Sequence, residues 1–386
     1  EDSKHEIGII LNFNIQNLAL DLMRRHCGFI TSSRELTPSK KRNTIRRESL
    51  KTEIVKKISE LEHVTPKHCY LYPSGMAAVF TAIFSLLNEG KGPFLGLGSL
   101  YVDTLRILEK WPSKYGLAET IFIRKNVSNK LAALHQNKIA GAILEFPSNP
   151  LIELMDVEKV IDQVHSREGK VIIDNTIATP YNFRPFDHGA DMVIHSTTKF
   201  LSGKNNHIGG VLLVKDEDLG DLGKNISQYS KLLKINMCFD EMKVLSRNIR
   251  GFEKRMQRMN SSAEVIANFL KDHPSVEKIY YPTLKDDKND QLFLKYMKGG
   301  GGLMSFILKG SSKERARIFY DHVQPPILKG PSLGSEKTLL SPYVMMAHYN
   351  DSENELARLG LHPYLMRLSV GIEPVEKIIR SLKRAL

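Results

Sequence analysis

Cysteine and long apolar runs are scarce in this 386-residue sequence. The three cysteines, Cys27, Cys69 and Cys238, have no CxxC spacing, so we expect neither a disulfide framework nor a zinc site, and a reducing compartment. No apolar run reaches the roughly 18 residues that suggest a membrane span. The first ten residues are mixed and charged, unlike a secretory signal. These absences predict a cytoplasmic protein with no membrane contact and no metal.

Positive charge is in excess, with 55 basic and 43 acidic residues and a formal net charge of +12. The string KKRNTIRR at 40–47 is of a kind that contacts nucleic acid. The other basic residues are scattered, however, and no aromatic residues interleave with them to stack on bases. We therefore expect a solvated basic loop and no nucleic-acid partner. A positive surface also attracts small anionic substrates.

Helical and strand patterns alternate after about residue 51. The string LKTEIVKKISELE predicts an amphipathic helix, and AAVFTAIFSLLNEG predicts a buried helix that ends at Gly90. Three short apolar runs, GAILEF, KVIIDN and DMVIHS, predict strands. Alternation of this kind is typical of a mostly parallel sheet covered by helices on both faces.

The last third of the chain has fewer apolar strands. One long helical pattern covers 240–270, and KGGGGLMSFIL at 298–308 lacks the GK[ST] ending of a phosphate loop, so it predicts a turn into a strand. We expect an N-terminal segment at 1–50, a large α/β domain at 51–245, and a smaller C-terminal α/β domain at 246–386.

Polar side chains follow each of the three predicted strands. In an open parallel sheet, ligands bind beyond the carboxyl ends of the strands. Each residue alone is also explained as a turn or a helix cap. Together they offer the carboxylate, lysine and hydroxyls that a phosphate-bearing pyridine cofactor needs. The residues are Glu145, Ser148, Asn149, Asp174, Thr176, Ser196, Thr198 and Lys199.

A phosphate also needs neutral donors, and the string YPSGMAAVF supplies a place for it. Ser74, Gly75 and Met76 are expected at the N-terminus of the buried helix. Unpaired amides and the helix dipole favour an anion there, and glycine permits close approach of the backbone.

Several of these strings resemble the motifs of the Cys/Met-metabolism family of pyridoxal-phosphate (PLP) enzymes. The matching strings occur in order from about residue 70 to the C-terminus: SGMAA, YVDT, EFPSNP, IIDNT, HSTTKF and MRLSVGIEPVE. Within that family CYLYPSGMAAVF, LEFPSNPL and LLSPYVMMAHY are most similar to the fungal-type cystathionine γ-synthase branch. The resemblance implies an aspartate-aminotransferase-like fold (PLP fold type I).

The resemblance also implies a role for each matching residue. Lys199 would form the Schiff base and act as a catalytic base, Asp174 would hold the ring nitrogen, and Tyr101 would stack on the ring and shuttle protons. The phosphate and cofactor contacts would come from Ser74, Gly75, Met76, Thr176, Ser196 and Thr198. The substrate would be held by Asn149, Ser332 and Arg367, with Arg367 binding its α-carboxylate.

One family string is missing: the Tyr-x-Arg and Asn-Pro-Thr pattern before SGM, which contacts the phosphate of a neighbouring subunit. The string ITSSREL resembles its fungal-type counterpart and makes Arg34 the candidate for that role, with a solvated arginine as the alternative. The family habit implies a homodimer or homotetramer with shared active sites.

The resulting hypothesis is an enzyme that acts on small amino-acid substrates. It performs a γ-replacement on an O-acyl-homoserine with a thiol such as cysteine, forming cystathionine for methionine biosynthesis. The alternatives are a C–S lyase, which performs γ- or β-elimination, and an O-acylhomoserine sulfhydrylase. A non-catalytic relative is disfavoured because Lys199, Asp174, Tyr101 and Arg367 are all present.

Overall fold

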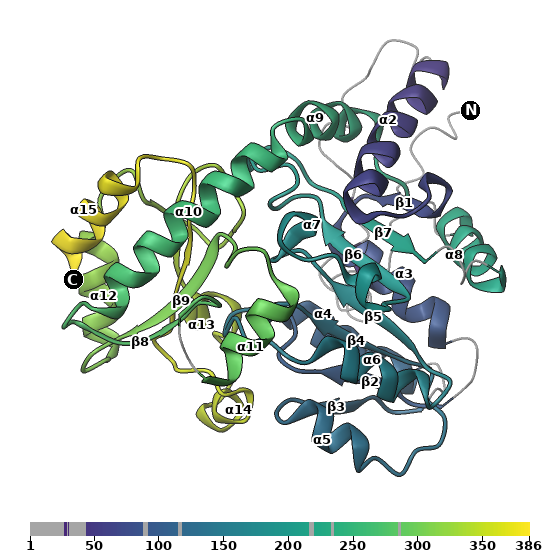
Figure 1. The fold of residues 1–386 in the computed structure, drawn as a ribbon, viewed down its shortest axis with the longest axis horizontal. Coiled ribbons are helices and arrows are strands. Elements are labelled where there is room, and N and C mark those ends of the chain that lie inside the picture. Colours follow the sequence, from purple (N-terminus) through teal and green to yellow (C-terminus); the bar gives the residue numbers. More distant parts are fainter. Residues whose placement is uncertain are drawn as a thin grey trace, which may run out of the picture.

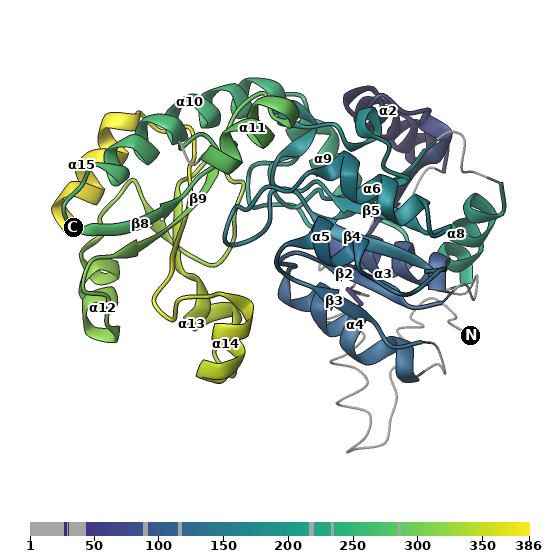
Figure 2. The ribbon, with the colours of Figure 1, turned by 60° about the horizontal axis from the view of Figure 1, so that its bottom comes forward.

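Two β-sheets lie side by side in the computed structural model of this chain (Figures 1 and 2). It describes residues 27, 28, 30, 44–87, 92–114, 118–215, 220–232, 235–284 and 287–386. Most of the N-terminal segment, including Arg34, lies outside these residues. Within the described ranges, no helix combines the length and the apolar character needed to cross a membrane.

The larger sheet has seven strands in the order β1-β7-β6-β5-β4-β2-β3. Strand β7 is antiparallel to both of its neighbours, and the remaining pairs are parallel. The three apolar runs predicted as strands form the centre of this sheet as β4, β5 and β6. The strands are β1 (Cys69–Tyr72), β2 (Phe94–Leu97), β3 (Ile121–Ile123), β4 (Gly141–Glu145), β5 (Lys170–Asp174), β6 (Met192–Ser196) and β7 (Gly210–Val214).

Helices cover both faces of this sheet because alternate strand residues point to opposite sides. Ile172 and Ile194 belong to one apolar cluster, with α3, α4 and α8, whereas Ile173 and Val193 belong to another, with α2, α5, α6 and α9. The first set is α3 (Gly75–Leu87), α4 (Val102–Lys114) and α8 (Gly220–Leu232). The second is α2 (Thr44–Glu62), α5 (Val127–Ala132), α6 (Val157–His165) and α9 (Phe239–Ile249). The predicted mostly parallel sheet between two helical layers is confirmed.

The smaller sheet has five strands in the order β10-β11-β12-β9-β8, antiparallel except between β10 and β11. An apolar core joins it to α10, α12 and α15, which lie on its outer side in Figure 1. The strands are β8 (Val276–Tyr280), β9 (Leu303–Leu308), β10 (Leu328–Lys329), β11 (Leu339–Pro342) and β12 (Met366–Ser369). The helices after α9 are α10 (Phe252–Lys271), α11 (Asp287–Tyr296), α12 (Lys313–His322), α13 (Tyr343–Ala347), α14 (Glu353–Leu359) and α15 (Val375–Ala385).

The long helical pattern at 240–270 is two helices and not one. Helix α9 ends at Ile249 and α10 begins at Phe252, with Gly251 as the N-cap residue between them. Glycine weakens a helix interior by about 1 kcal/mol relative to alanine. The Asn248 carbonyl accepts a hydrogen bond from the Arg255 side chain (2.8 Å), a contact that apolar periodicity does not reveal.

Candidate functional site

The polar residues that follow β4, β5 and β6 meet at one edge of the larger sheet. Asp174 is in register with Glu145 of β4 and with Ile194 of β6. The Thr176 amide donates a hydrogen bond to Asp174 Oδ1 (3.0 Å), and the Ser196 amide donates one to Thr176 Oγ1 (2.8 Å). These bonds fix the turn after β5 against the end of β6, so that Asp174, Thr176 and Ser196 form one cluster.

A buried carboxyl group, that of Glu145, and a partly buried one, that of Asp174, lie next to each other at this edge. Burial raises the pKa of Asp174, while hydrogen bonds from Thr176 and the charge of His195 oppose that rise. Burial, and then the negative charge of Asp174, raise the pKa of Glu145 well above its usual range. Glu145 in turn accepts a hydrogen bond from the Tyr101 amide. This edge of the sheet therefore offers a carboxyl group that can pair with a cationic group of a ligand.

Helix α3 begins directly against Ser196. The Ser74 hydroxyl caps the helix: it accepts from the Ala77 amide (3.0 Å) and donates to the Gly28 carbonyl (2.7 Å). A side chain at Gly75 would place its Cβ 2.8 Å from the Ser196 Cβ, so only glycine permits this close approach. The first amides of α3, those of Gly75 and Met76, have no acceptor inside the helix. They form an anion cradle beside the Ser196 hydroxyl.

Lys199 lies one turn beyond β6 and is half-buried. Its Nζ donates a hydrogen bond to Ser332 Oγ (3.2 Å), which belongs to the loop before β11. Burial, and then the charge of Arg367, lower its pKa to about 8. The lowered pKa makes the free amine of Lys199, the form that acts as a nucleophile or a base, more available than that of an ordinary lysine. Nearby, Thr198 Oγ1 accepts from the Gly209 amide (3.0 Å).

A glycine brings the smaller sheet's loop onto Lys199. Gly334 has φ of +77°, and a Cβ there would lie 2.8 Å from the Lys199 carbonyl carbon and 2.5 Å from the Phe200 nitrogen. Both the backbone conformation and the contact require glycine. This close approach places Ser332 within reach of the lysine amine.

Arg367 enters the site from β12. Its guanidinium donates to Asn149 Oδ1 (3.1 Å) and to the Pro331 carbonyl, and it stacks over the Tyr343 ring at 4.8 Å. Its side chain is almost fully buried, and burial lowers the pKa of the guanidinium. Among the residues that the structure describes, no carboxylate pairs with it. A buried arginine fork held in this way is suited to bind a ligand carboxylate.

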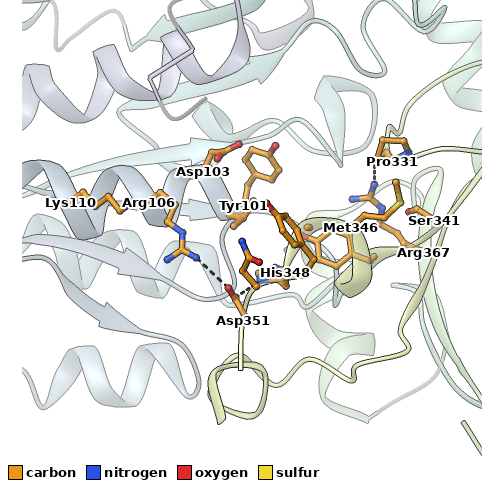
Figure 3. Close-up of a pocket in the computed structure, with 15 residues that line it drawn as sticks. Tyr101, Asp103, Arg106, Lys110, Pro331, Ser341, Met346, His348, Asp351 and Arg367 are labelled. Carbon is orange, nitrogen blue, oxygen red and sulfur yellow. Dashed lines mark hydrogen bonds and ion pairs between the residues drawn. The ribbon is translucent and has the colours of Figure 1, made fainter. Parts of the chain in front are cut away.

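A cavity of about 430 Å³ opens beside Tyr101 and Arg367 (Figure 3). It lies between the start of α4 and the 341–351 segment that contains α13. Arg106 of α4 reaches across to Asp351 (3.3 Å), and Asp351 also pairs with His348 (2.8 Å). The volume is typical of a small-molecule site.

The structure thus brings the sequence-predicted residues into one region, except Arg34, which is outside the described residues. Sequence reasoning quoted the string LLSPYVMMAHY but did not single out its Tyr343, whose ring stacks against the Arg367 guanidinium. It also missed Glu62, a fully buried carboxylate of α2 that contacts the chain on either side of this edge. Only the assembled sheet brings Glu62 to this place.

Comparisons with known proteins assign the family. Residues 39–386 match the family described as "Cys/Met metabolism PLP-dependent enzyme". The chain is 34% identical over 332 residues to a Neurospora crassa cystathionine γ-synthase, covering 82% of this chain but only 51% of that protein's length. It is 31% identical to a Bacillus subtilis cystathionine β-lyase over 82% of this chain and 79% of the relative. A solved cystathionine γ-synthase from Xanthomonas oryzae superposes with a TM-score of 0.79 at 26% identity, covering 90% of this chain and 88% of that one.

The residues of this chain fit the cofactor of that family. The cradle of amides and hydroxyl at Gly75, Met76 and Ser196 suits a phosphate. Asp174 would offer a partly buried carboxyl group to a pyridinium nitrogen, and Lys199 would offer an amine of lowered pKa.

Proposed function

Because the chain belongs to the Cys/Met metabolism family of PLP-dependent enzymes, we propose that it catalyses γ-replacement on an O-acyl-homoserine with a thiol such as cysteine, forming cystathionine. The observation that carries the proposal is the placement of the Lys199 amine beside Ser332, near Arg367 and a cavity with room beyond the carboxylate-binding fork. The similarity to the Neurospora synthase supports a thiol acceptor.

In this proposal the chain holds PLP at both ends. Lys199 would bind it covalently, Asp174 would pair with the ring nitrogen, and Tyr101 would cover the ring. Gly75, Met76, Ser196 and Thr198 would hold the phosphate, and the hydrogen bonds of Ser74 and Thr176 fix the backbone around them. When bound, PLP supplies an electron sink that stabilises negative charge on the substrate's α-carbon.

The chain's own residues then orient the substrate and move its protons. Arg367, held by Asn149, binds the α-carboxylate, and Ser332 lies beside it. Once the substrate amine has displaced it, the Lys199 amine would remove the α proton, pass that proton to solvent, and then remove a β proton. The Cγ–O bond would break, and the acyloxy group would leave as a carboxylate. The thiol sulfur would form the new bond to Cγ and release its proton. The Lys199 ammonium would protonate Cβ, take up a proton from solvent, and then protonate Cα. General acid–base work of this kind contributes about 100- to 10,000-fold in rate.

The cavity beside Arg367 is the proposed entry for the thiol substrate. Its lining joins Tyr101 to Asp103, Arg106 and Lys110 of α4 and to His348 (Figure 3). A charged and hydrogen-bonding lining suits a zwitterionic amino acid better than an apolar ligand.

Elimination is the second candidate, because the chain is 31% identical to the Bacillus subtilis lyase and 34% identical to the Neurospora synthase. A lyase uses the same lysine and arginine but needs no thiol. A sulfhydrylase would accept sulfide in place of cysteine. These three reactions differ in what occupies the cavity and not in the lysine chemistry.

Product analysis separates the candidates. The purified protein with PLP is incubated with O-acetyl- or O-succinyl-homoserine, with and without cysteine or sulfide. Thiol-dependent cystathionine supports the proposal, whereas keto acid and ammonia formed without thiol identify a lyase, and homocysteine formed from sulfide identifies a sulfhydrylase. Lys199→Ala should abolish every product, while Lys204→Ala, which changes an exposed lysine of the same loop, should leave turnover unchanged.

We also propose a homodimer or homotetramer with shared active sites, in which Arg34 reaches a neighbouring subunit's phosphate. Activity per mole should fall when the protein is diluted to monomers, as followed by light scattering. Full activity in a monomer would contradict shared sites. Arg34→Ala should weaken PLP binding in the oligomer.

A further inference from the structure

A buried polar cluster lies on the opposite face of the larger sheet from α3. Glu62 Oε1 accepts hydrogen bonds from His195 Nε2 (2.6 Å) and from Asn175 Nδ2 (3.1 Å). Asn175 Nδ2 also donates to the Phe183 carbonyl (2.9 Å). Glu62 and Asn175 are fully buried, and His195 is 1% exposed. The cluster therefore has no access to solvent.

Each partner of Glu62 is the sequence neighbour of a residue in the proposed cofactor site. Asn175 follows Asp174 at the end of β5, and His195 precedes Ser196 at the end of β6. The Asn175 amide also donates to the Ile194 carbonyl (2.9 Å), which joins the two strand ends through the backbone. Because successive side chains of a strand point to opposite faces of the sheet, the cluster lies on one face and the proposed cofactor site on the other, at the ends of the same two strands. The Glu62 carboxylate therefore links the ends of β5 and β6 through hydrogen bonds on the face opposite the site.

A glutamate at position 62 is unfavourable for the stability of the fold. It is the last residue of the 19-residue helix α2, where the helix dipole disfavours negative charge. Burying a carboxylate costs much more than burying an amide, and an amide oxygen would accept the same two bonds. Within the described part of the chain, Glu62 Oε2, His195 Nδ1 and Asn175 Oδ1 have no hydrogen-bond partner. Helix stability therefore does not account for this cluster.

We propose that Glu62 is a positioning residue for the cofactor: by orienting Asn175 and His195, it fixes Asp174 and Ser196 relative to each other. The inference rests on the site assigned under the proposed function, in which Asp174 pairs with the ring nitrogen and Ser196 with the phosphate. The charge of His195, which lowers the pKa of Asp174, acts in the same direction by favouring the ionised carboxylate that a pyridinium requires. Glu145 is a further titratable group against Asp174, and the negative charge of Asp174 adds to the burial that raises the Glu145 pKa.

The test measures PLP binding rather than turnover. Apoprotein prepared from the holoenzyme is titrated with PLP for wild type, Glu62→Leu and Glu62→Gln, and the ring-nitrogen chemical shift of bound ¹⁵N-labelled PLP is recorded. Asp174→Ala provides the reference for loss of the ring-nitrogen partner. Glu62→Leu should raise the PLP dissociation constant about tenfold or more, since hydrogen bonds to a charged group are lost. Its ring-nitrogen shift should move toward that of Asp174→Ala. Glu62→Gln keeps the two hydrogen bonds but not the charge, so its dissociation constant should lie between those of wild type and Glu62→Leu.

Asp191 is the matched control for a carboxylate that only stabilises the fold. It is 2% exposed and pairs with His165 (2.8 Å) and Lys170 (3.0 Å) at the opposite, amino ends of β5 and β6. Asp191→Leu should lower the urea midpoint of the apoprotein but leave the PLP dissociation constant within about threefold of wild type.

Three results would overturn the proposal: a Glu62→Leu protein that binds PLP within about threefold of wild type, an Asp191→Leu protein that loses as much affinity, or an unchanged ring-nitrogen shift. If Glu62→Leu does not fold, Asn175→Ala decides, and normal binding by that variant refutes the proposal. Normal binding by Asp174→Ala would overturn the site assignment and this proposal with it. The reaction is tested separately, because the choice between synthase and lyase does not alter PLP affinity.

Discussion

Arg255 of α10 should contribute more to stability than any surface arginine of the same helix. Its guanidinium donates to the carbonyls of Leu201 (3.0 Å), Ser202 (3.1 Å) and Asn248 (2.8 Å). The first two belong to the turn that follows Lys199. The arginine is 7% exposed, so these carbonyls would find no water if it were removed.

The magnitude follows from these three contacts. A hydrogen bond from a charged donor contributes about 1.5–3 kcal/mol, so three at the lower value total about 4.5 kcal/mol. Methionine fills part of the space, and we expect Arg255→Met to lower the free energy of unfolding by about 4 kcal/mol. That loss is a large share of the about 5–15 kcal/mol that stabilises a typical protein.

Urea unfolding followed by circular dichroism measures the effect on the holoenzyme. Arg258→Met, an exposed position on the same helix, is the control and should change stability by no more than about 0.5 kcal/mol. A loss below about 1 kcal/mol for Arg255→Met would show that the three carbonyls find other donors, and would refute the reasoning.

Three further predictions concern the site itself. In PLP-free protein, acylation of Lys199 by an amine reagent should rise through about pH 8, because the deprotonated amine reacts; a rise confined to above pH 10, seen by peptide mass mapping, contradicts the lowered pKa. Gly334→Ala should lower the free energy of unfolding in urea by more than about 2 kcal/mol. Gly310 also has a positive φ, but a Cβ there would have no atom within 4 Å, so Gly310→Ala should cost about 1 kcal/mol. Equal losses would exclude the steric contribution at Gly334. Asn149→Asp should raise KM at least about tenfold with a smaller change in kcat, because the new carboxylate competes for Arg367; an unchanged KM excludes that role.

The strands that carry the site could be predicted from local pattern. Short apolar runs bounded by polar residues mark β4, β5 and β6, and each is fully or largely buried between helical layers. The rule that ligands bind beyond the carboxyl ends of parallel strands then placed Asp174, Ser196 and Lys199 together. The break between α9 and α10 was missed, since apolar periodicity continues across Gly251.

The supporting residues could not be predicted in this way. Tyr343 stacks against Arg367, and Glu62 accepts a hydrogen bond from Asn175, the residue after Asp174. Nothing in the residues next to them in sequence indicates these contacts. Glu62 lies 133 residues from His195, and Lys199 lies 133 residues from Ser332. Such partners depend on strand order and on how two sheets pack, which short-range periodicity does not encode.

The sequence by itself determined the strand ends, the helix start at Gly75 and the chemical identity of the groups placed there, because these follow from local periodicity and from which residues come after each strand. Only the tertiary structure decided which charges are buried, and therefore how their pKa values move. Burial lowers the pKa of Lys199 and raises that of Asp174. Desolvation depends on how the surrounding chain packs. The contact of Ser332 with Lys199 likewise forms only when the two sheets have packed against each other.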